Sequence, residues 1–298
     1  MDKKIKVAIL GTGNIGSDLA ERLLASDDFE LVAVAGRRPE SSGLARLRSR
    51  VSLVSSSGID GFRDCWDSIQ GVFDATSAKD HLMHSLELRK LGKWVIDLTP
   101  SKIGKATVPV LADQYPDFGY LTTDVANYSM VTCGGQSSAP VIAAIAEASS
   151  EIQEIEISSS ISSDSAGPAT RRNIDNYVDS TESLARGVAR TNKVKSILVL
   201  NPAEPPPLMR TTVVARAPGI LLEHAKEIVH RYVSKTQDYV PGYELVVEPH
   251  FIEQGVLSAT VSVEGEGYFL PRHAGNLDII NAAAVEVARR HVALNGRV

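Results

Sequence analysis

The sequence predicts an α/β protein in which a doubly wound parallel sheet precedes a second, α+β domain. Three observations predict this fold class. A glycine-rich turn follows a short apolar run near the N-terminus. Apolar runs then alternate with helix-like stretches as far as about residue 130. Beyond that point strand-like stretches alternate polar and apolar residues, which is typical of a sheet with one covered face.

The first 35 residues predict one strand–helix–strand unit. Residues 5–10 are mostly apolar, as in a buried parallel strand, and residues 17–25 carry leucines at helical spacing. A second apolar run covers 29–35, which gives the unit the size of a parallel crossover. The alternation continues with expected strands at 71–76 and 93–98 around an expected helix at 80–91.

The rest of the chain predicts an antiparallel sheet with covering helices. Strict alternation at 154–161 indicates a half-solvated strand. The expected strands are 154–161, 196–200, 211–216, 243–249 and 257–263, and the expected helices are 139–148, 174–189, 221–232 and 276–293.

Composition excludes several classes of function. The 298 residues carry a net charge of −5, so no basic face is needed and nucleic acid is not an expected partner. The first apolar run is too short for a signal core or a membrane span, which predicts a cytoplasmic protein with no membrane partner. The seven histidines show no metal-ligand spacing, so no metal is expected. His81 and His84 are expected to be solvated or to cap a helix.

The glycine-rich turn predicts a dinucleotide site. Gly11, Gly13 and Gly16 lie between the first strand and the first helix. In a Rossmann unit such glycines permit the tight turn, the approach of a pyrophosphate and close helix packing. A glycine-rich turn of another α/β fold is the alternative.

The end of the second strand favours NADP over NAD. NAD-binding units usually carry an acidic residue here for the ribose hydroxyl, whereas this chain has Arg37 and Arg38. Guanidinium groups bind phosphate oxygens in a fork, which suits a 2′-phosphate. A solvated charge pair on a loop is the alternative.

Cys133 is the candidate nucleophile. It precedes two glycines at a predicted helix start, where the helix N-terminus stabilises a thiolate and backbone N–H groups can bind an oxyanion. A buried structural cysteine is the alternative. Cys65 has no such setting and is expected to serve packing, and no disulfide is expected.

Several blocks of the sequence resemble the acylating, CoA-dependent acetaldehyde dehydrogenases that work beside an aldolase. The central block is Met130-Val131-Thr132-Cys133-Gly134-Gly135-Gln136. The other blocks are 13–19, 73–78, 96–100, 165–168, 201–206, 239–243 and 274–279, in the same order along the chain.

The resemblance implies a nucleotide domain at 1–131 plus 276–298 and a catalytic and dimerisation domain at 132–275. Cys133 would attack an aldehyde, hydride would pass to the nicotinamide, and coenzyme A or another thiol would take the acyl group. A homodimer and an aldolase partner are implied as well. The implied dinucleotide contacts, beyond the three glycines and two arginines, are Thr12, Asn14, Ile15, Thr76, Ser77, Ser165, Ala166, Gly167, Pro168, Asn173 and Asn276.

The chain departs from the family pattern at four places. Arg37 and Arg38 replace an acidic residue and a proline, and Thr211 replaces an aspartate that would polarise the active site. His273 stands where the family tends to have tyrosine, and we hypothesise that it supplies proton transfer in place of the missing carboxylate. Changes beside the nucleophile, at 137–139, suggest an acyl group other than acetyl.

The sequence therefore predicts an NAD(P)-dependent enzyme that interconverts an aldehyde and an acyl thioester through Cys133. Two alternatives stay open. One is a semialdehyde or acyl-phosphate reductase of the same fold. The other is a non-catalytic NADP-binding partner protein, since Thr211 breaks one pattern of the active site.

Overall fold

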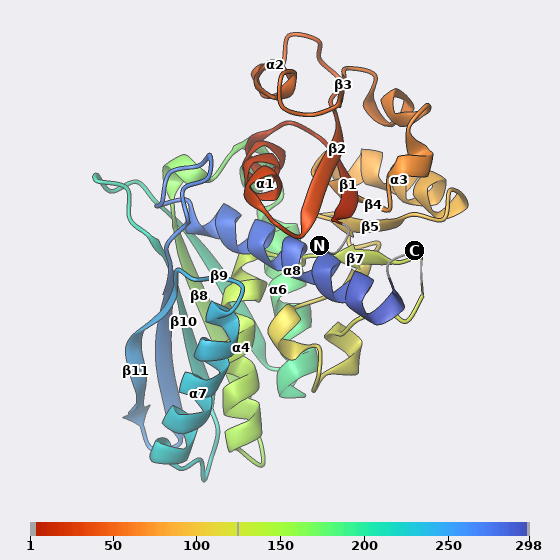
Figure 1. Cartoon of the computed structure of the whole chain (residues 1–298). Helices are drawn as coiled ribbons and strands as arrows, with labels where there is room; N and C mark the ends of the chain where they lie inside the picture. Colours follow the sequence, from red (N-terminus) through yellow and green to blue (C-terminus); the bar gives the residue numbers. More distant parts are fainter. Residues whose placement is uncertain (1–3, 124, 297–298) are drawn as a thin grey trace. The chain divides into compact units, whose positions relative to one another are not determined.

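The computed structural model describes residues 4–123 and 125–296, which fold as two compact units (Figure 1). Unit 1 comprises residues 1–107, 120–130 and 284–298, and unit 2 comprises 108–119 and 131–283. The last helix, α8 (Gly275–Asn295), is shared between the two units. None of the described helices has the length and apolar character needed to cross a membrane.

Unit 1 is built on a seven-stranded parallel sheet with the order β3-β2-β1-β4-β5-β7-β6. Its strands are β1 (Ile5–Leu10), β2 (Phe29–Ala35), β3 (Leu53–Ser55), β4 (Gly71–Asp74), β5 (Trp94–Asp97), β6 (Lys105–Ala106) and β7 (Asn127–Ser129). Its helices are α1 (Asn14–Ala25), α2 (Ser42–Leu47), α3 (Ala78–Lys90) and the second half of α8, with short 3-10 turns η1 (Gly58–Phe62) and η2 (Trp66–Ser68). The central strands are apolar and buried, as expected for a doubly wound sheet.

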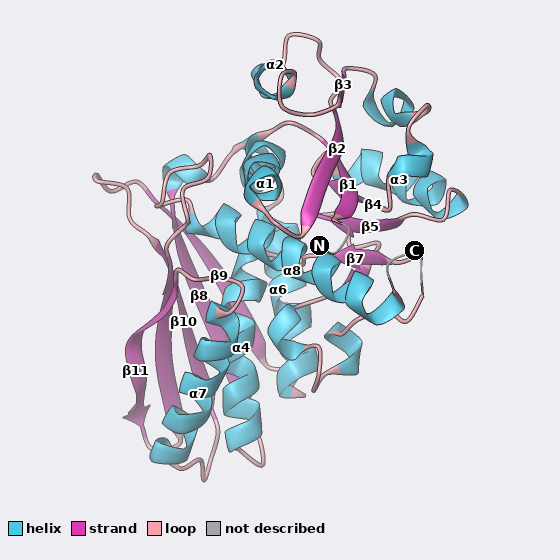
Figure 2. Ribbon diagram, in the orientation of Figure 1, coloured by secondary structure: helices cyan, strands magenta, loops and turns pink. Residues whose placement is uncertain are grey.

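Unit 2 is a five-stranded sheet with the order β11-β12-β10-β8-β9. Its strands are β8 (Glu154–Ser162), β9 (Val194–Asn201), β10 (Met209–Arg216), β11 (Tyr243–Glu253) and β12 (Val256–Val263). Its helices are α4 (Cys133–Ala148), α5 (Pro168–Arg172), α6 (Ile174–Ala189) and α7 (Leu222–Gln237), with 3-10 turns η3 (Pro109–Leu111), η4 (Pro116–Phe118) and η5 (Ser163–Ser165). Figure 2 shows α4 and α7 along one side of this sheet, and α4 also packs against α6.

The expectation of a purely antiparallel sheet in unit 2 was wrong. Strands β8 and β9 are parallel, and their register runs from Ile155 opposite Val194 to Ser162 opposite Asn201. Helix α6 lies between them in the chain and packs on β9, which makes the segment a βαβ crossover. Alternation of polar and apolar residues reports which face is buried, but not the direction of the neighbouring strand.

The unit boundaries differ from the expected domains. Residues 108–119 belong to unit 2, because η3 packs on α4 and α7 and Leu111 is fully buried. On the same segment, Phe118 lies so close to Gly187 of α6 that a Cβ there would be 2.6 Å from the ring. The C-terminal segment of unit 1 begins at residue 284, inside α8, whereas the expected boundary was residue 276.

Candidate active site

The glycine-rich turn joins β1 to α1, and its three glycines have different reasons to be glycine. Gly11 has φ +98°, and an added Cβ would lie 2.5 Å from the carbonyl oxygen of Ala75. At Gly16 a Cβ would lie 2.0 Å from the carbonyl oxygen of Gly11. At Gly13, in contrast, an added Cβ would meet nothing within 4 Å. The fold requires Gly11 and Gly16, whereas the open space at Gly13 suits the close approach of a ligand.

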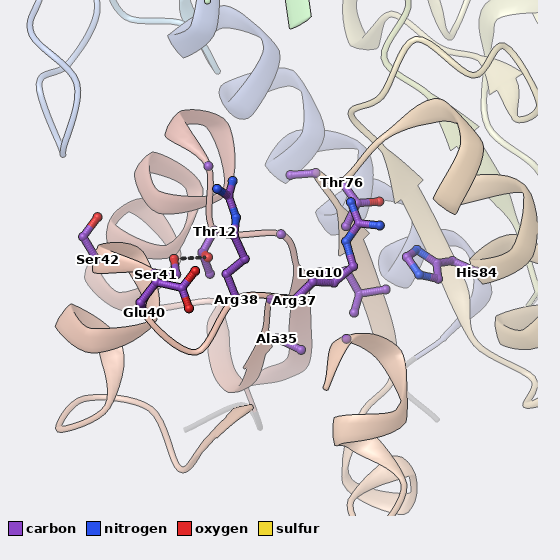
Figure 3. Close-up of a pocket in the computed structure, with 15 residues that line it drawn as sticks. Leu10, Thr12, Ala35, Arg37, Arg38, Glu40, Ser41, Ser42, Thr76 and His84 are labelled. Atoms are coloured by element: carbon purple, nitrogen blue, oxygen red, sulfur yellow. Dashed lines mark hydrogen bonds between the residues drawn. The ribbon is translucent and has the colours of Figure 1, made fainter. Parts of the chain in front are cut away.

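A cavity of about 510 Å³ lies beside this turn in unit 1 (Figure 3). The turn contributes Gly11, Thr12 and Gly13, and the loop after β2 contributes Arg37 and Arg38. Thr76, after β4, closes another side. These six predicted site residues therefore lie around one cavity at the carboxyl ends of parallel strands, the usual position of a dinucleotide.

The two arginines reach to different sides of this cavity (Figure 3). Arg37 donates through Nη1 to Asp80 at 3.0 Å, while its side chain is 69% exposed. Asp80 also accepts from the hydroxyl of Ser77, which caps α3. Arg38 is exposed on the loop that continues to Ser41, whose hydroxyl lies 2.9 Å from that of Thr12. Glu40 lines the same cavity, so the positive field of the arginines is partly offset.

His81 and His84 gather around the buried carboxylate of Asp74, which corrects the expectation of solvated or capping roles. Both rings place Nδ1 on the same oxygen of Asp74, at 2.9 and 2.8 Å. His81 is fully buried and its Nε2 lies 3.6 Å from Asp97. Burial opposes the charged form of His81, but Asp74 and Asp97 outweigh it and raise the pKa of His81. His84 also lines the nucleotide cavity.

Cys133 is the first residue of the 16-residue helix α4. The hydroxyl of Thr132 caps the helix by accepting from the N–H of Gly135 at 2.8 Å. Val131 has φ +58°, a strained conformation for a β-branched residue, and it directs the chain into the helix start. The helix start predicted at Cys133 is confirmed, and regular helix already covers the six residues before Ala139, with Pro140 inside α4. The capping threonine is a sequence signal for this start.

Opposing influences act on the pKa of the Cys133 thiol. Burial raises the pKa of this half-buried thiol to about 11, although the N–H groups of Gly134 and Cys133 and the hydroxyl of Tyr177 lower it. Desolvation thus opposes the stabilisation of a thiolate that is expected from the helix N-terminus. The pKa of Cys65 is also raised, mainly by burial, and Cys65 packs against the apolar core of unit 1 as predicted.

A cluster of buried hydroxyl groups lies behind Cys133 in unit 2. Thr211, on β10, has its Oγ1 2.8 Å from Ser137 Oγ on α4 and 3.1 Å from Ser159 Oγ on β8. Tyr177, on α6, points its hydroxyl at Gly134, where an added Cβ would lie only 1.9 Å from Oη. The position of the family's aspartate is thus filled by a neutral hydroxyl that is satisfied by two serines.

The remaining predicted residues of unit 2 lie on its loops and on α8. Arg171 ties the loop after β8 by donating to the carbonyl oxygens of Ser163 and Ala166. Asn276 is buried on α8, and its Oδ1 has no hydrogen-bond partner among the described residues, as expected of a group that awaits a ligand. His273 is half-exposed, and no described contact joins it to Cys133.

Sorted by unit, the predicted residues fall into two sets. Asn14, Ile15 and Gly16 form the first turn of α1 and Ser77 caps α3, so they support the nucleotide cavity in unit 1 without lining it. The predicted residues of unit 2 are Cys133, Ser165, Ala166, Gly167, Pro168, Asn173, His273 and Asn276; the side chain of Pro168 lies outside the described part. Sequence reasoning missed His84 and Tyr177, since neither stands in a recognisable pattern.

Two family descriptions match the chain. Residues 133–271 match "Prokaryotic acetaldehyde dehydrogenase, dimerisation", and residues 6–59 match "NADP oxidoreductase coenzyme F420-dependent". Among solved structures, an aspartate semialdehyde dehydrogenase from Vibrio cholerae has a TM-score of 0.65 at 14% identity, over 98% of this chain and 99% of that one. The enzyme of the same name from Candida albicans, solved with NADP, gives 0.65 at 12% identity over the same shares. At such identities these structures show the fold alone.

A Rossmann-type nucleotide unit followed by a mixed α+β unit defines a nicotinamide-dependent oxidoreductase. Curated relatives named acetaldehyde dehydrogenase cover nearly the whole chain. That of Spirochaeta aurantia is 44% identical over 97% of this chain and 95% of its own length. That of Carboxydothermus hydrogenoformans is 42% identical over 98% and 96%. The chain therefore belongs to the acetaldehyde dehydrogenase family, aldehyde-acting oxidoreductases of acylating character.

Proposed function

We propose that this chain interconverts an aldehyde and an acyl thioester with NADP(H) as redox cofactor, and that the acyl group is carried on Cys133. The position of Cys133 at the start of α4, with two backbone N–H groups directed at its sulfur, carries this proposal. Such N–H groups can also stabilise an oxyanion that forms next to the sulfur. A thioester keeps a reactive carbonyl, so hydride transfer and acyl transfer share one intermediate.

In the oxidising direction, the sulfur forms a bond to the aldehyde carbon and the carbonyl becomes an alcohol. The thiol proton must leave during this attack, because a group with a pKa of about 11 is almost entirely protonated at neutral pH. NADP⁺, held by Gly11 to Gly13 and by Arg37 and Arg38, would supply the acceptor for the hydride on that carbon. The alcohol proton is released as the thioester forms. A second thiol, proposed to be coenzyme A, then replaces Cys133 on the acyl carbon and returns the sulfur to its protonated state.

NADP(H) is the proposed cofactor because the loop after β2 presents Arg37 and Arg38 and no acidic residue directly at the strand end. A charge-assisted contact to a phosphate contributes about 1.5–3 kcal/mol, which corresponds to roughly 10- to 150-fold in affinity. Titration of the protein with NADPH and NADH should give tighter NADPH binding by at least tenfold. In Arg38→Ala this preference should shrink, and equal affinity of the wild type for both cofactors would contradict the proposal.

The acyl donor is tested with a panel of acyl-CoA thioesters and acyl phosphates, with NADPH oxidation as the readout. We expect turnover with an acyl-CoA and none in Cys133→Ala. Turnover with acyl phosphates alone would favour the semialdehyde or acyl-phosphate reductase alternative. No turnover with any donor, and no acyl transfer to Cys133, would favour the non-catalytic alternative.

The roles of His273 and of the aldolase partner stay predictions. His273 is proposed to assist proton transfer, and wild-type turnover in His273→Ala would remove that role.

A homodimer is proposed through the open face of the unit 2 sheet, because the match to a dimerisation family covers this unit. Ile197 and Val199 of β9 and Val247 of β11 are apolar side chains left exposed on that face.

A further inference from the structure

Tyr177 lies on α6 with its side chain only 8% exposed, and its hydroxyl approaches the helix start that carries Cys133. A Cβ on Gly134 would be 1.9 Å from Tyr177 Oη and 2.8 Å from Cζ. The residue after Cys133 must therefore be glycine for the tyrosine hydroxyl to reach this place. The packing of α6 against α4 thus brings the Tyr177 hydroxyl against the backbone directly after the nucleophile.

The hydroxyl of Tyr177 makes no well-formed hydrogen bond within the described chain, although Ser159, Cys133 and the backbone of Gly134 approach it closely enough to shift its pKa. Nearly all buried hydroxyl groups in proteins are paired, because an unpaired one loses its contacts with water and gains none. Ser159 also lies close to this place, since its Oγ is 3.0 Å from the same Cβ position on Gly134. Ser159 already lies within hydrogen-bond distance of Thr211. The geometry thus places a donor beside the sulfur, where a negative charge on that sulfur strengthens the contact.

The ionisation of the two side chains is coupled. Burial raises the pKa of Tyr177 well above its usual value, and a charge on Cys133 raises it further. In return, the hydroxyl lowers the pKa of Cys133. Tyr177 therefore stays protonated throughout the working range of pH and acts as a donor, not as a base.

We propose that Tyr177 is a catalytic residue whose O–H donates a hydrogen bond to the sulfur of Cys133 whenever that sulfur is negatively charged. The sulfur carries this charge when it attacks the carbonyl carbon and again when it leaves the acyl group. In this chain the neutral hydroxyl of Tyr177 thus stabilises the charged sulfur, whereas position 211 carries a threonine and no carboxylate. The inference rests on the proposed role of Cys133 as the attacking sulfur.

The test measures the sulfur itself, without cofactor or substrate. Iodoacetamide alkylates a thiolate: the sulfur forms a bond to carbon, iodide leaves, and the thiol proton goes to solvent. The second-order rate at Cys133 is followed between pH 7 and 9.5 by mass spectrometry of the peptide that contains it. In Tyr177→Phe we expect alkylation about 10- to 100-fold slower at each pH, because the ionised sulfur loses one charge-assisted hydrogen bond.

Tyr243→Phe is the matched control. It removes a buried hydroxyl that bonds to the carbonyl oxygen of Ser137 in the same helix, at 2.7 Å, and it should change the alkylation rate by less than about threefold. In a second arm, 3,5-difluorotyrosine is placed at position 177. Its more acidic hydroxyl is a stronger donor, so alkylation should become faster than in the wild type.

An unchanged or faster rate in Tyr177→Phe, or an equal loss in Tyr243→Phe, would overturn the inference. Acyl transfer from acetyl-CoA to the wild-type protein is measured in parallel. If Cys133 takes no acyl group while Tyr177→Phe still slows alkylation, the proposed function fails and the hydrogen bond stands. If acyl transfer occurs and the alkylation rates are equal, the proposed function stands and the role of Tyr177 is refuted.

Discussion

Replacement of single glycines in the β1–α1 turn separates ligand binding from folding. Gly13 lies at the start of α1 with φ −73°, which any residue adopts, and an added Cβ meets nothing within 4 Å. Gly13→Ala should therefore change the free energy of unfolding by less than about 1 kcal/mol. At Gly16 the added Cβ lies 2.0 Å from the backbone oxygen of Gly11, well inside the 3.4 Å at which ordinary contact begins.

The backbone of the turn must shift to admit Gly16→Ala. Overpacking of this kind costs about 3 kcal/mol or more, since no flexible side chain can move away. For a protein of this size such a loss lowers the melting temperature by about 6 °C or more. Thermal unfolding of the two variants beside the wild type measures the difference.

NADPH binding should be lost in Gly13→Ala, the variant whose thermal stability is expected to stay close to that of the wild type. A methyl group at position 13 occupies the space through which a pyrophosphate would approach the backbone, and loss of one or two charge-assisted hydrogen bonds amounts to roughly 3 kcal/mol. The dissociation constant of NADPH for Gly13→Ala should rise about 100-fold or more, without loss of thermal stability. Normal NADPH binding in this variant would refute the assignment of the turn, and equal destabilisation of both variants would refute the packing argument.

Two further substitutions test the buried polar clusters. The pKa of His81 is higher in the folded protein than in the unfolded chain, which releases this proton near pH 6.5. The protonated His81 therefore stabilises the folded protein fully below pH 6.5. This contribution to the free energy of unfolding is lost as the pH rises through the pKa of His81 in the folded protein. Urea unfolding measures the difference in the free energy of unfolding between the wild type and His81→Asn. This difference should become smaller between pH 6 and 9, by about 1.4 kcal/mol for each pKa unit of the shift. A difference that does not change with pH would contradict the ion pairing. Thr211→Val leaves the hydroxyls of Ser137 and Ser159 without this partner and should lower the free energy of unfolding by about 1–3 kcal/mol, whereas a loss below 0.5 kcal/mol would show that the hydroxyl cluster contributes little.

Much of unit 1 could be predicted from the sequence because its signals are local. The glycines of the turn mark the backbone positions where a side chain cannot fit, and the apolar runs at 5–10 and 29–35 are strands that are buried on both faces. The cavity residues Arg37 and Arg38 follow directly from the position of the second strand end. Each of these inferences needs only neighbours in the chain.

Other features depend on partners that are distant in sequence. Asp74 and Asp97 end adjacent strands, and this juxtaposition buries His81 between them, which helical spacing could not reveal. The raised pKa of Cys133 depends on the surrounding packing, which outweighs the helix start. Tyr177 reaches the nucleophile from another helix, 44 residues further along the chain.

The proposed function requires the sulfur of Cys133 to form a covalent bond to the substrate acyl group. The most direct measurement is the intact mass of the protein after incubation with acetyl-CoA or propionyl-CoA in the absence of NADPH, followed by peptide mapping. We expect a mass increase of one acyl group, located on Cys133 and absent from Cys133→Ser. Failure of the wild type to take up an acyl group, or acylation that persists in Cys133→Ser, would contradict it.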